Sequence, residues 1–158
     1  IEADLNRLER LTRGLLELAH ADMAKTSNES ACVADLDLDV ETTGALDARA
    51  TISKESLRAS ISHLVNNARQ HGASNVRIDV TPADECLEIV VTDDGKGIPP
   101  ANQDRIFDPF FTTKRDDGGT GLGLAIVRTL VNNAGGDIEY LPQPARGTRF
   151  RLTLPKAA

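Results

Sequence analysis

The spacing of apolar residues predicts a helix at the start of the chain. Over residues 1–25, apolar side chains recur at intervals of three and four, so they share one face of a helix, and charged residues fill the other face. The stripe is typical of an amphipathic helix that packs on its own domain, and it fits a helical hairpin or a dimeric bundle at least as well. Residues 26–30 are polar, and we interpret them as a linker.

The same periodicity predicts two further helices. One covers residues 53–71, because Ser53 is a suitable N-cap and Gly72 a suitable terminator. The other covers residues 122–134 and ends before two glycines.

Alternating apolar and polar residues predict the strands. These strands cover residues 76–81, 86–93, 137–140 and 148–154, with a hairpin turn between the first two. Residues 35–40 also alternate, which predicts a half-buried strand followed by a turn at residues 42–44. Because helices and strands segregate, we expect an α+β fold, a two-layer α/β sandwich whose antiparallel-rich sheet is covered by helices on one face.

Composition limits the classes of function. The 158 residues are 40% hydrophobic but only 3% aromatic, which predicts one domain with an aliphatic core. A net charge of −6 argues against a nucleic-acid binder. Cys32 and Cys86 lack the spacing of a metal site, so we expect unpaired thiols. No apolar run is long enough to cross a membrane and the chain opens on Ile1, so we interpret it as a cytoplasmic fragment of a longer protein.

A glycine-rich block leads directly into the last predicted helix. Its residues are Gly119, Thr120, Gly121, Leu122, Gly123 and Leu124. Free backbone N–H groups and the positive end of a helix dipole suit a triphosphate, and glycines allow its oxygens to approach closely. The spacing is neither that of a dinucleotide-binding GxGxxG turn nor that of a Walker motif.

A second block begins where a predicted strand ends at Asp93. A carboxylate fixed there can accept a hydrogen bond from the exocyclic amine of adenine, and it rejects guanine, which has an oxygen at that place. Gly95 and Gly97 permit a tight turn, and Ile98 would form part of an apolar slot. Alone, the block is equally compatible with an ordinary hairpin turn.

Two more blocks complete the series. Asn67 lies within a predicted helix, where Asn is a poor helix former, and shares a face with His63; we interpret Asn66 as a surface residue. Residues 107–114 contain three of the four Phe residues, either as a hydrophobic plug or as the base of a mobile lid.

In this order, the four blocks resemble the catalytic, ATP-binding domain of bacterial sensor histidine kinases, in the GHKL superfamily. The resemblance runs from about Ser53 to Leu154 and implies a Bergerat-type ATP-binding fold for residues 31–158. Residues 1–25 more weakly resemble the C-terminal part of the second helix of the dimerisation/phosphoacceptor domain. The passage before Asp39 departs from the family, which usually has a helix there, so either that helix is absent or residues are missing.

The resemblance implies that the chain binds ATP with Mg²⁺, with Asn67 as a metal ligand. The implied ATP-binding residues are Asn67, Gln70, His71, Asp93, Gly95, Gly97, Ile98, Phe107, Phe110, Lys114, Thr120, Gly121, Leu122, Gly123 and Leu124. Phe107 and Phe110 would anchor the lid, and Lys114 would reach the phosphates. Relatives that hydrolyse ATP carry Glu where this chain has His63, which argues against an ATPase of the gyrase or chaperone kind.

No His residue of this chain is followed by the acidic residue that marks a phosphoacceptor in the family. The resemblance therefore implies a kinase catalytic domain that transfers the ATP γ-phosphoryl to a His on a separate domain, from which a response regulator receiver domain takes it. The parent protein would be a homodimer, with an inner-membrane anchor as one option. The alternatives are an anti-sigma-type serine kinase and a nucleotide-sensing module without transfer.

Overall fold

The computed structural model describes residues 1–23, 29–113, 119–143 and 146–157. The strands are β1 (Glu41–Gly44), β2 (Val76–Pro82), β3 (Cys86–Asp93), β4 (Asp137–Tyr140) and β5 (Thr148–Pro155). The helices are α1 (Glu2–Met23), α2 (Lys54–Gln70) and α3 (Gly123–Asn133), with short 3₁₀ helices η1 (Val33–Asp35) and η2 (Pro100–Asn102). They include every predicted helix and strand except the strand predicted at residues 35–40.

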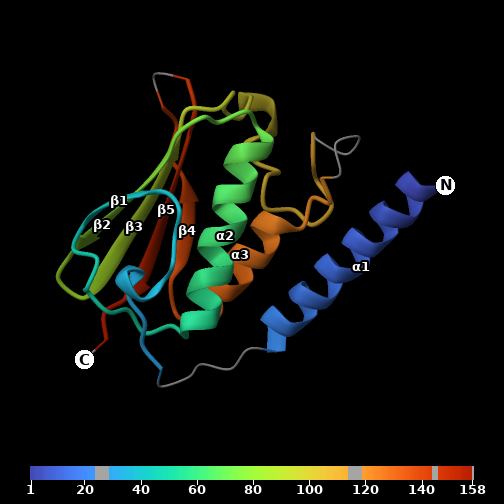
Figure 1. The fold of residues 1–158 in the computed structure, drawn as a ribbon. Helices are drawn as coiled ribbons and strands as arrows, with labels where there is room; N and C mark the ends of the chain where they lie inside the picture. The colour runs from blue at the N-terminus through green and yellow to red at the C-terminus, as the bar shows by residue number, and fades with distance from the viewer. Residues whose placement is uncertain (24–28, 114–118, 144–145, 158) are drawn as a thin grey trace.

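The strands form one mixed sheet in the order β1-β2-β3-β5-β4. β1 runs parallel to β2, and the other neighbours are antiparallel. α2 and α3 cover one face of this sheet, and α1 lies against α3 (Figure 1). The predicted α+β two-layer sandwich is therefore confirmed.

The main core lies between the sheet and the two covering helices. Burial alternates strictly along β3 and β5, as expected for strands with one covered face. Leu87 and Ile89 of β3 are buried together with Leu57 and Ile61 of α2 in this core. The side chains on the other face of β3 and β5 remain partly exposed.

The helix ends follow the predicted signals. Ser53 accepts a hydrogen bond from the Ser56 N–H at 3.1 Å, so it caps α2. Gly72 follows α2 with a φ of 81°, and Gly135 follows α3 with a φ of 85°. These left-handed conformations favour glycine and explain why both helices end there.

The strand predicted over residues 35–40 is wrong. The chain forms η1 and then irregular backbone, and the strand comes later, at β1, where a turn was predicted. The Asp35 carboxylate bonds Cys32, and this hydrogen bond, with a smaller contribution from Arg49, holds the Asp35 pKa below its usual value. Such hydrogen bonds between a side chain and nearby residues compete with the backbone hydrogen bonds of a β-strand. Leu36 is nevertheless buried, which accounts for the alternation without a strand.

α1 packs on α3 through a small apolar cluster apart from the main core. Its members are Ala21 of α1 with Leu122, Ile126 and Leu130. Leu18 of α1 packs partly buried against this cluster, whereas Leu5, Leu8, Leu15 and Leu16 of α1 are exposed. None of the helices in the described ranges is long and apolar enough to span a membrane. The division of the chain at residues 26–30 stays a prediction, since residues 24–28 lie outside the described ranges.

Candidate functional site

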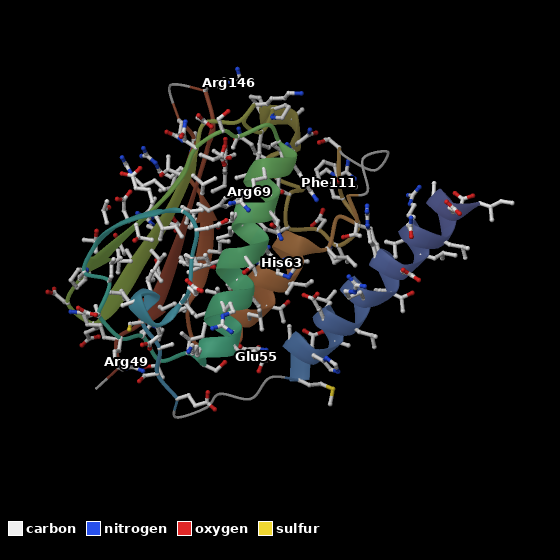
Figure 2. All side chains as sticks on the ribbon, in the orientation of Figure 1. Arg49, Glu55, His63, Arg69, Phe111 and Arg146 are labelled. Atoms are coloured by element: carbon white, nitrogen blue, oxygen red, sulfur yellow. The ribbon has the colours of Figure 1, made fainter. Side chains whose placement is uncertain are left out.

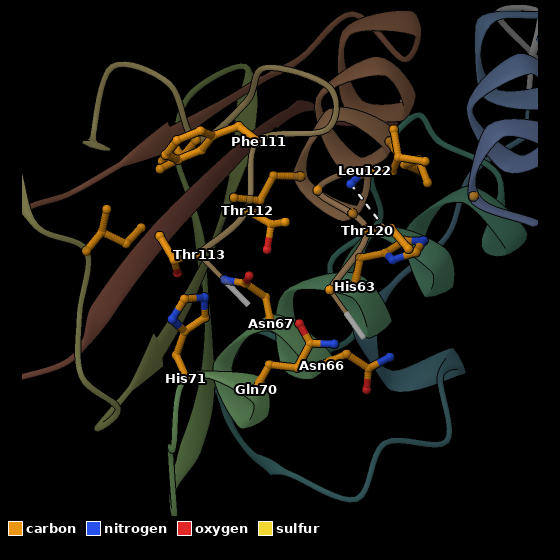
Figure 3. Close-up of a pocket in the computed structure, with 18 of the residues that line it drawn as sticks. His63, Asn66, Asn67, Gln70, His71, Phe111, Thr112, Thr113, Thr120 and Leu122 are labelled. Atoms are coloured by element: carbon orange, nitrogen blue, oxygen red, sulfur yellow. Dashed lines mark hydrogen bonds between the residues drawn. The ribbon is translucent and has the colours of Figure 1, made fainter. Parts of the chain in front are cut away.

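A cavity of about 590 Å³ lies where α2, the N-terminus of α3, the loop after β3 and α1 meet (Figure 3). Ten of the residues predicted from the sequence line it: Asn67, Gln70, His71, Gly97, Ile98, Thr120, Gly121, Leu122, Gly123 and Leu124. These residues come from three segments that are distant in the sequence. The fold therefore brings most of the predicted site to one place. Asn66, interpreted from the sequence as a surface residue, is exposed and lines the cavity too.

Asp93 and Gly95 do not line the cavity themselves, but they closely precede Gly97 and Ile98, which do. The Asp93 side chain is only 6% exposed. Its Oδ1 accepts the Gly95 N–H at 2.8 Å and the Thr148 N–H at 3.3 Å, while its Oδ2 accepts the Thr148 hydroxyl. An ionised carboxylate has about four acceptor positions, so these three bonds leave one for a further donor.

Two residues that the sequence did not indicate complete this end of the site. Tyr140 lies close enough to the Asp93 carboxylate and the Ile98 backbone for both to affect the pKa of its hydroxyl. Burial, and then the negative charge of Asp93, raise the Tyr140 pKa above 10.0, although a backbone hydrogen bond at Ile98 opposes the shift. Thr148 holds the Asp93 carboxylate from β5. Neither residue has a sequence signal, because each looks like an ordinary strand position.

The loop after β3 is fixed from both sides. Asp94 accepts hydrogen bonds from the Ser74 and Asn75 N–H groups at 2.7 and 2.9 Å, which ties the end of β3 to the start of β2. These bonds, led by that from the Asn75 backbone, lower the Asp94 pKa below its usual value. The Arg146 Nε donates to the Gly95 carbonyl at 3.1 Å. The turn that carries Gly97 and Ile98 is thus held before any ligand binds.

In the Phe-rich segment, residues 107–114, some side chains pack in the core and others line the cavity. Phe107 does not line the cavity; its ring packs edge-on against Phe150 at 6.3 Å, with the Arg128 guanidinium 5.3 Å above it. Phe110 also lies outside the lining and is exposed, with a φ of 71°. The lining residues of this segment are Phe111, Thr112 and Thr113, of which Phe111 was not singled out from the sequence. Lys114, predicted to reach the phosphates, lies outside the described residues.

The glycine block forms the other end of the cavity, immediately before α3. Gly121 has a φ of 75°, and a Cβ there would lie 2.4 Å from the Phe110 carbonyl carbon. The Thr120 hydroxyl accepts a hydrogen bond from the Leu122 N–H at 3.3 Å (Figure 3). Because Gly123 begins α3, the first N–H groups of that helix have no partners within it. This arrangement suits an anion, and only glycine fits at residue 121.

His63 lines the cavity from the side of α2 that faces α1 (Figure 2). Its Nε2 lies 2.8 Å from the Glu17 Oε2 of α1. Asn67, one turn further along α2, lines the same cavity. Among the described residues, no cluster of three or more His, Cys, Asp or Glu side chains could hold a metal. A cation such as Mg²⁺, which takes one or two protein ligands and fills its shell with phosphate oxygens and water, needs no such cluster.

Comparison with known sequences gives a consistent picture. Residues 53–158 match the family described as histidine kinase-, DNA gyrase B-, and HSP90-like ATPase. The chain is 45% identical over 86 residues to sensor histidine kinase ZraS of Escherichia coli, a match that covers 54% of this chain and 18% of that protein. It is 36% identical over 125 residues to sensor-like histidine kinase SenX3 of Mycobacterium bovis, covering 75% of this chain and 30% of that protein. The chain thus spans roughly a fifth to a third of these relatives.

Solved structures share the fold. Full-length ShkA in complex with AMPPNP aligns with a TM-score of 0.72 at 26% identity, over 97% of this chain and 36% of that one. A mycobacterial sensor histidine kinase, MprB, aligns with a TM-score of 0.63 at 26% identity, over 94% of this chain and 93% of that one. The sequence resemblance and the fold class are both confirmed by these matches.

Proposed function

Since the chain belongs to the family of histidine kinase-, DNA gyrase B- and HSP90-like ATPases, we propose that it is the ATP-binding catalytic domain of a two-component sensor histidine kinase. The observation that carries the proposal is the convergence of three distant segments on one cavity. Asn67 of α2, Ile98 of the loop after β3 and Gly121 before α3 all line it. Its volume of about 590 Å³ lies in the range of small-molecule and cofactor sites.

The adenine base would bind at the end of the cavity near Asp93. The acceptor position left free on the Asp93 carboxylate would take the exocyclic amine of adenine. Guanine presents an oxygen there and would leave a buried carboxylate facing an acceptor, which is costly. Ile98 and Phe111, both partly buried, would provide the apolar contacts of the base.

The phosphates would bind at the opposite end. The backbone at Gly121 and Gly123 and the start of α3 provide N–H groups for phosphate oxygens. The side-chain oxygen of Asn67 would be a ligand of Mg²⁺ there, with water and phosphate oxygens in the remaining positions. Bound Mg²⁺ would neutralise phosphate charge during transfer. Phe107 and Phe110 would support the base of a segment that closes over the nucleotide.

The reaction would depend on positioning rather than on a covalent intermediate with this domain. The attacking atom would be a His nitrogen of a separate acceptor domain; it would bond the γ-phosphorus as the bond to the β-γ bridging oxygen breaks and ADP leaves. Position 63 of α2 carries His in place of a water-activating Glu, and that His is held by Glu17. This arrangement supports transfer to a protein side chain in preference to hydrolysis.

The rest of the parent protein is also part of the proposal, because this chain spans only part of its relatives. α1 would be the C-terminal part of the dimerisation/phosphoacceptor domain, and the parent would be a homodimer. A response regulator receiver domain would accept the phosphoryl group from the acceptor His. None of His20, His63 and His71 in this chain is followed by an acidic residue.

The proposal is tested by phosphotransfer to an added acceptor. The chain is incubated with Mg²⁺ and γ-labelled ATP, with and without a separate domain that carries a His-Glu phosphoacceptor. We expect acid-labile label on the acceptor His and none on the chain alone. Stable label on His20, His63 or His71 would contradict the proposal, and so would ATP binding without any label on the acceptor.

A further inference from the structure

One face of α1 contributes directly to the wall of the cavity. Arg10, Arg13, Gly14 and Glu17 all line it. Their spacing of three, one and three residues places them on a single face of a helix. This face lies outside the segment that matches the family, residues 53–158, so neither the motifs nor the family assign it a part in the site.

α1 is held beside the glycine block by three specific contacts. Gly14 lies so close to Leu122 that a Cβ on Gly14 would come within 2.7 Å of the Leu122 Cδ1. Glu17 bonds His63 of α2, and the Asn133 side-chain amide of α3 donates to the Ala21 carbonyl at 2.5 Å. Leu122 itself belongs to the glycine block. The position of α1 is therefore set against the segment expected to hold the phosphates.

Arg10 and Arg13 are exposed at this wall and form no hydrogen bond or ion pair with another described residue. Other arginines in the described part of the chain, such as Arg49, Arg69 and Arg151, each pair with a carboxylate. The one carboxylate of α1 that lines the cavity, Glu17, is engaged with His63. The two guanidinium groups thus remain available to a ligand in a protein whose net charge is −6.

The geometry points to Arg10 and Arg13 as a pair that binds the β- and γ-phosphates of the nucleotide from α1. Guanidinium groups bind phosphate oxygens in a bidentate manner and stay charged at any working pH. A nucleoside triphosphate would then bridge α1 and the glycine block, whereas a monophosphate lacks the β- and γ-phosphates that the two arginines would bind. The inference rests on the proposed function, since it assigns residues to the phosphate end of the same site.

The test compares nucleotides that differ only in phosphate number. The variant Arg10→Ala/Arg13→Ala is matched by Arg7→Ala, which removes an exposed arginine of α1 that does not line the cavity. Affinities for ATP, ADP and AMP are measured by calorimetry with Mg²⁺. We expect the double variant to bind ATP roughly tenfold more weakly, ADP less so and AMP as well as the wild type. We expect Arg7→Ala to bind all three normally.

Two outcomes would overturn the inference: unchanged ATP affinity in the double variant, or an equal loss for ATP and AMP, which would indicate a structural defect. Thermal melts of all three proteins and an Arg10→Lys/Arg13→Lys variant, which keeps the charge and should recover part of the affinity, separate these cases. The failure of the proposed function looks different. In that case the wild type itself would bind no adenine nucleotide, or Asp93→Asn would leave its binding unchanged.

Discussion

The two ends of the cavity are built in different ways. At the Asp93 end, a buried carboxylate accepts three hydrogen bonds within the sheet and its loop, and Arg146 and Asp94 fix the loop from both sides. At the glycine end, the wall includes the backbone of the glycine block, the N-terminus of α3 and two arginines of α1. The first end is complete within the sheet, whereas the second depends on how α1 docks on α3.

We therefore expect the two ends of the cavity to have different roles in nucleotide binding. A base is flat and has a fixed hydrogen-bonding pattern, so a rigid end formed by β3 and β5 can select it. The phosphates must bind, react and leave. An end of the cavity that is formed by separate elements can therefore bind a triphosphate, a diphosphate and a monophosphate with different affinities. We expect mutations at the Asp93 end to change which nucleotide binds, and mutations at the glycine end to change how strongly its phosphates are held.

The largest effect is expected at the Asp93 end. Asp93→Asn replaces one acceptor with an N–H₂ donor that would face the amine of adenine, so ATP affinity should fall by about 2 kcal/mol, roughly thirtyfold. Asp94→Asn is the matched control, because Asp94 neighbours Asp93 but its side chain bonds Ser74 and Asn75 at the other side of the loop. Calorimetry should show near-normal binding for the control. Equal losses in the two variants would show that the loop, and not the carboxylate, determines binding.

A smaller effect is expected at the glycine end. Gly121→Ala forces a Cβ against Phe110 in a left-handed conformation and should weaken ATP binding about tenfold while lowering stability by about 1 kcal/mol. Gly135→Ala introduces the same backbone strain at the far end of α3, where the nearest atom, the Pro155 Cγ, is 3.4 Å away. We therefore expect a similar loss of stability from Gly135→Ala without a loss of affinity. If both variants bind ATP equally well, the glycine block does not hold phosphates.

The smallest effect is a titration. Tyr140 is the only tyrosine and the chain has no tryptophan, so tyrosinate absorbance reports on the Asp93 end alone. We expect its pKa to lie above 10.0 in the wild type and to fall towards that value in Asp93→Asn, while burial keeps it raised. The folded state favours the neutral phenol, so this contribution to stability is complete below pH 10.0 and lost as the pH rises through the raised pKa. Identical titrations in both proteins would mean that the two side chains do not interact.

The sequence predicts the Asp93 end of the cavity better than the glycine end. The bounds of β3 and β4 follow directly from alternation and turn residues, and the three main helices follow from periodicity and caps such as Ser53. Asn67 stands out because Asn is a poor helix former, whereas Asp93 and Gly121 stand out because each belongs to a glycine-containing motif. The alternation of apolar and polar residues predicts the first strand too early in the chain. Apolar side chains of residues 36–40 alternate and are buried or partly buried, but this segment does not pair with another strand.

What the sequence does not predict are the contacts between distant segments. Thr148 and Tyr140 are ordinary strand residues until the sheet places them beside Asp93. Arg10 and Arg13 belong to the polar face of an amphipathic helix, and such charges usually face solvent. Only the docking of α1 on α3, through close contacts such as Gly14 against Leu122, brings them to the cavity.

The central claim is that the Asp93 end of this cavity selects adenine, and it is tested most directly by comparing ATP with GTP. Calorimetry of the wild-type chain in the presence of Mg²⁺ measures both affinities, and the two ligands carry the same triphosphate. We predict that ATP binds and that GTP binds at least about a hundredfold more weakly, because its oxygen would face the Asp93 carboxylate. Equal affinities for ATP and GTP would contradict the account.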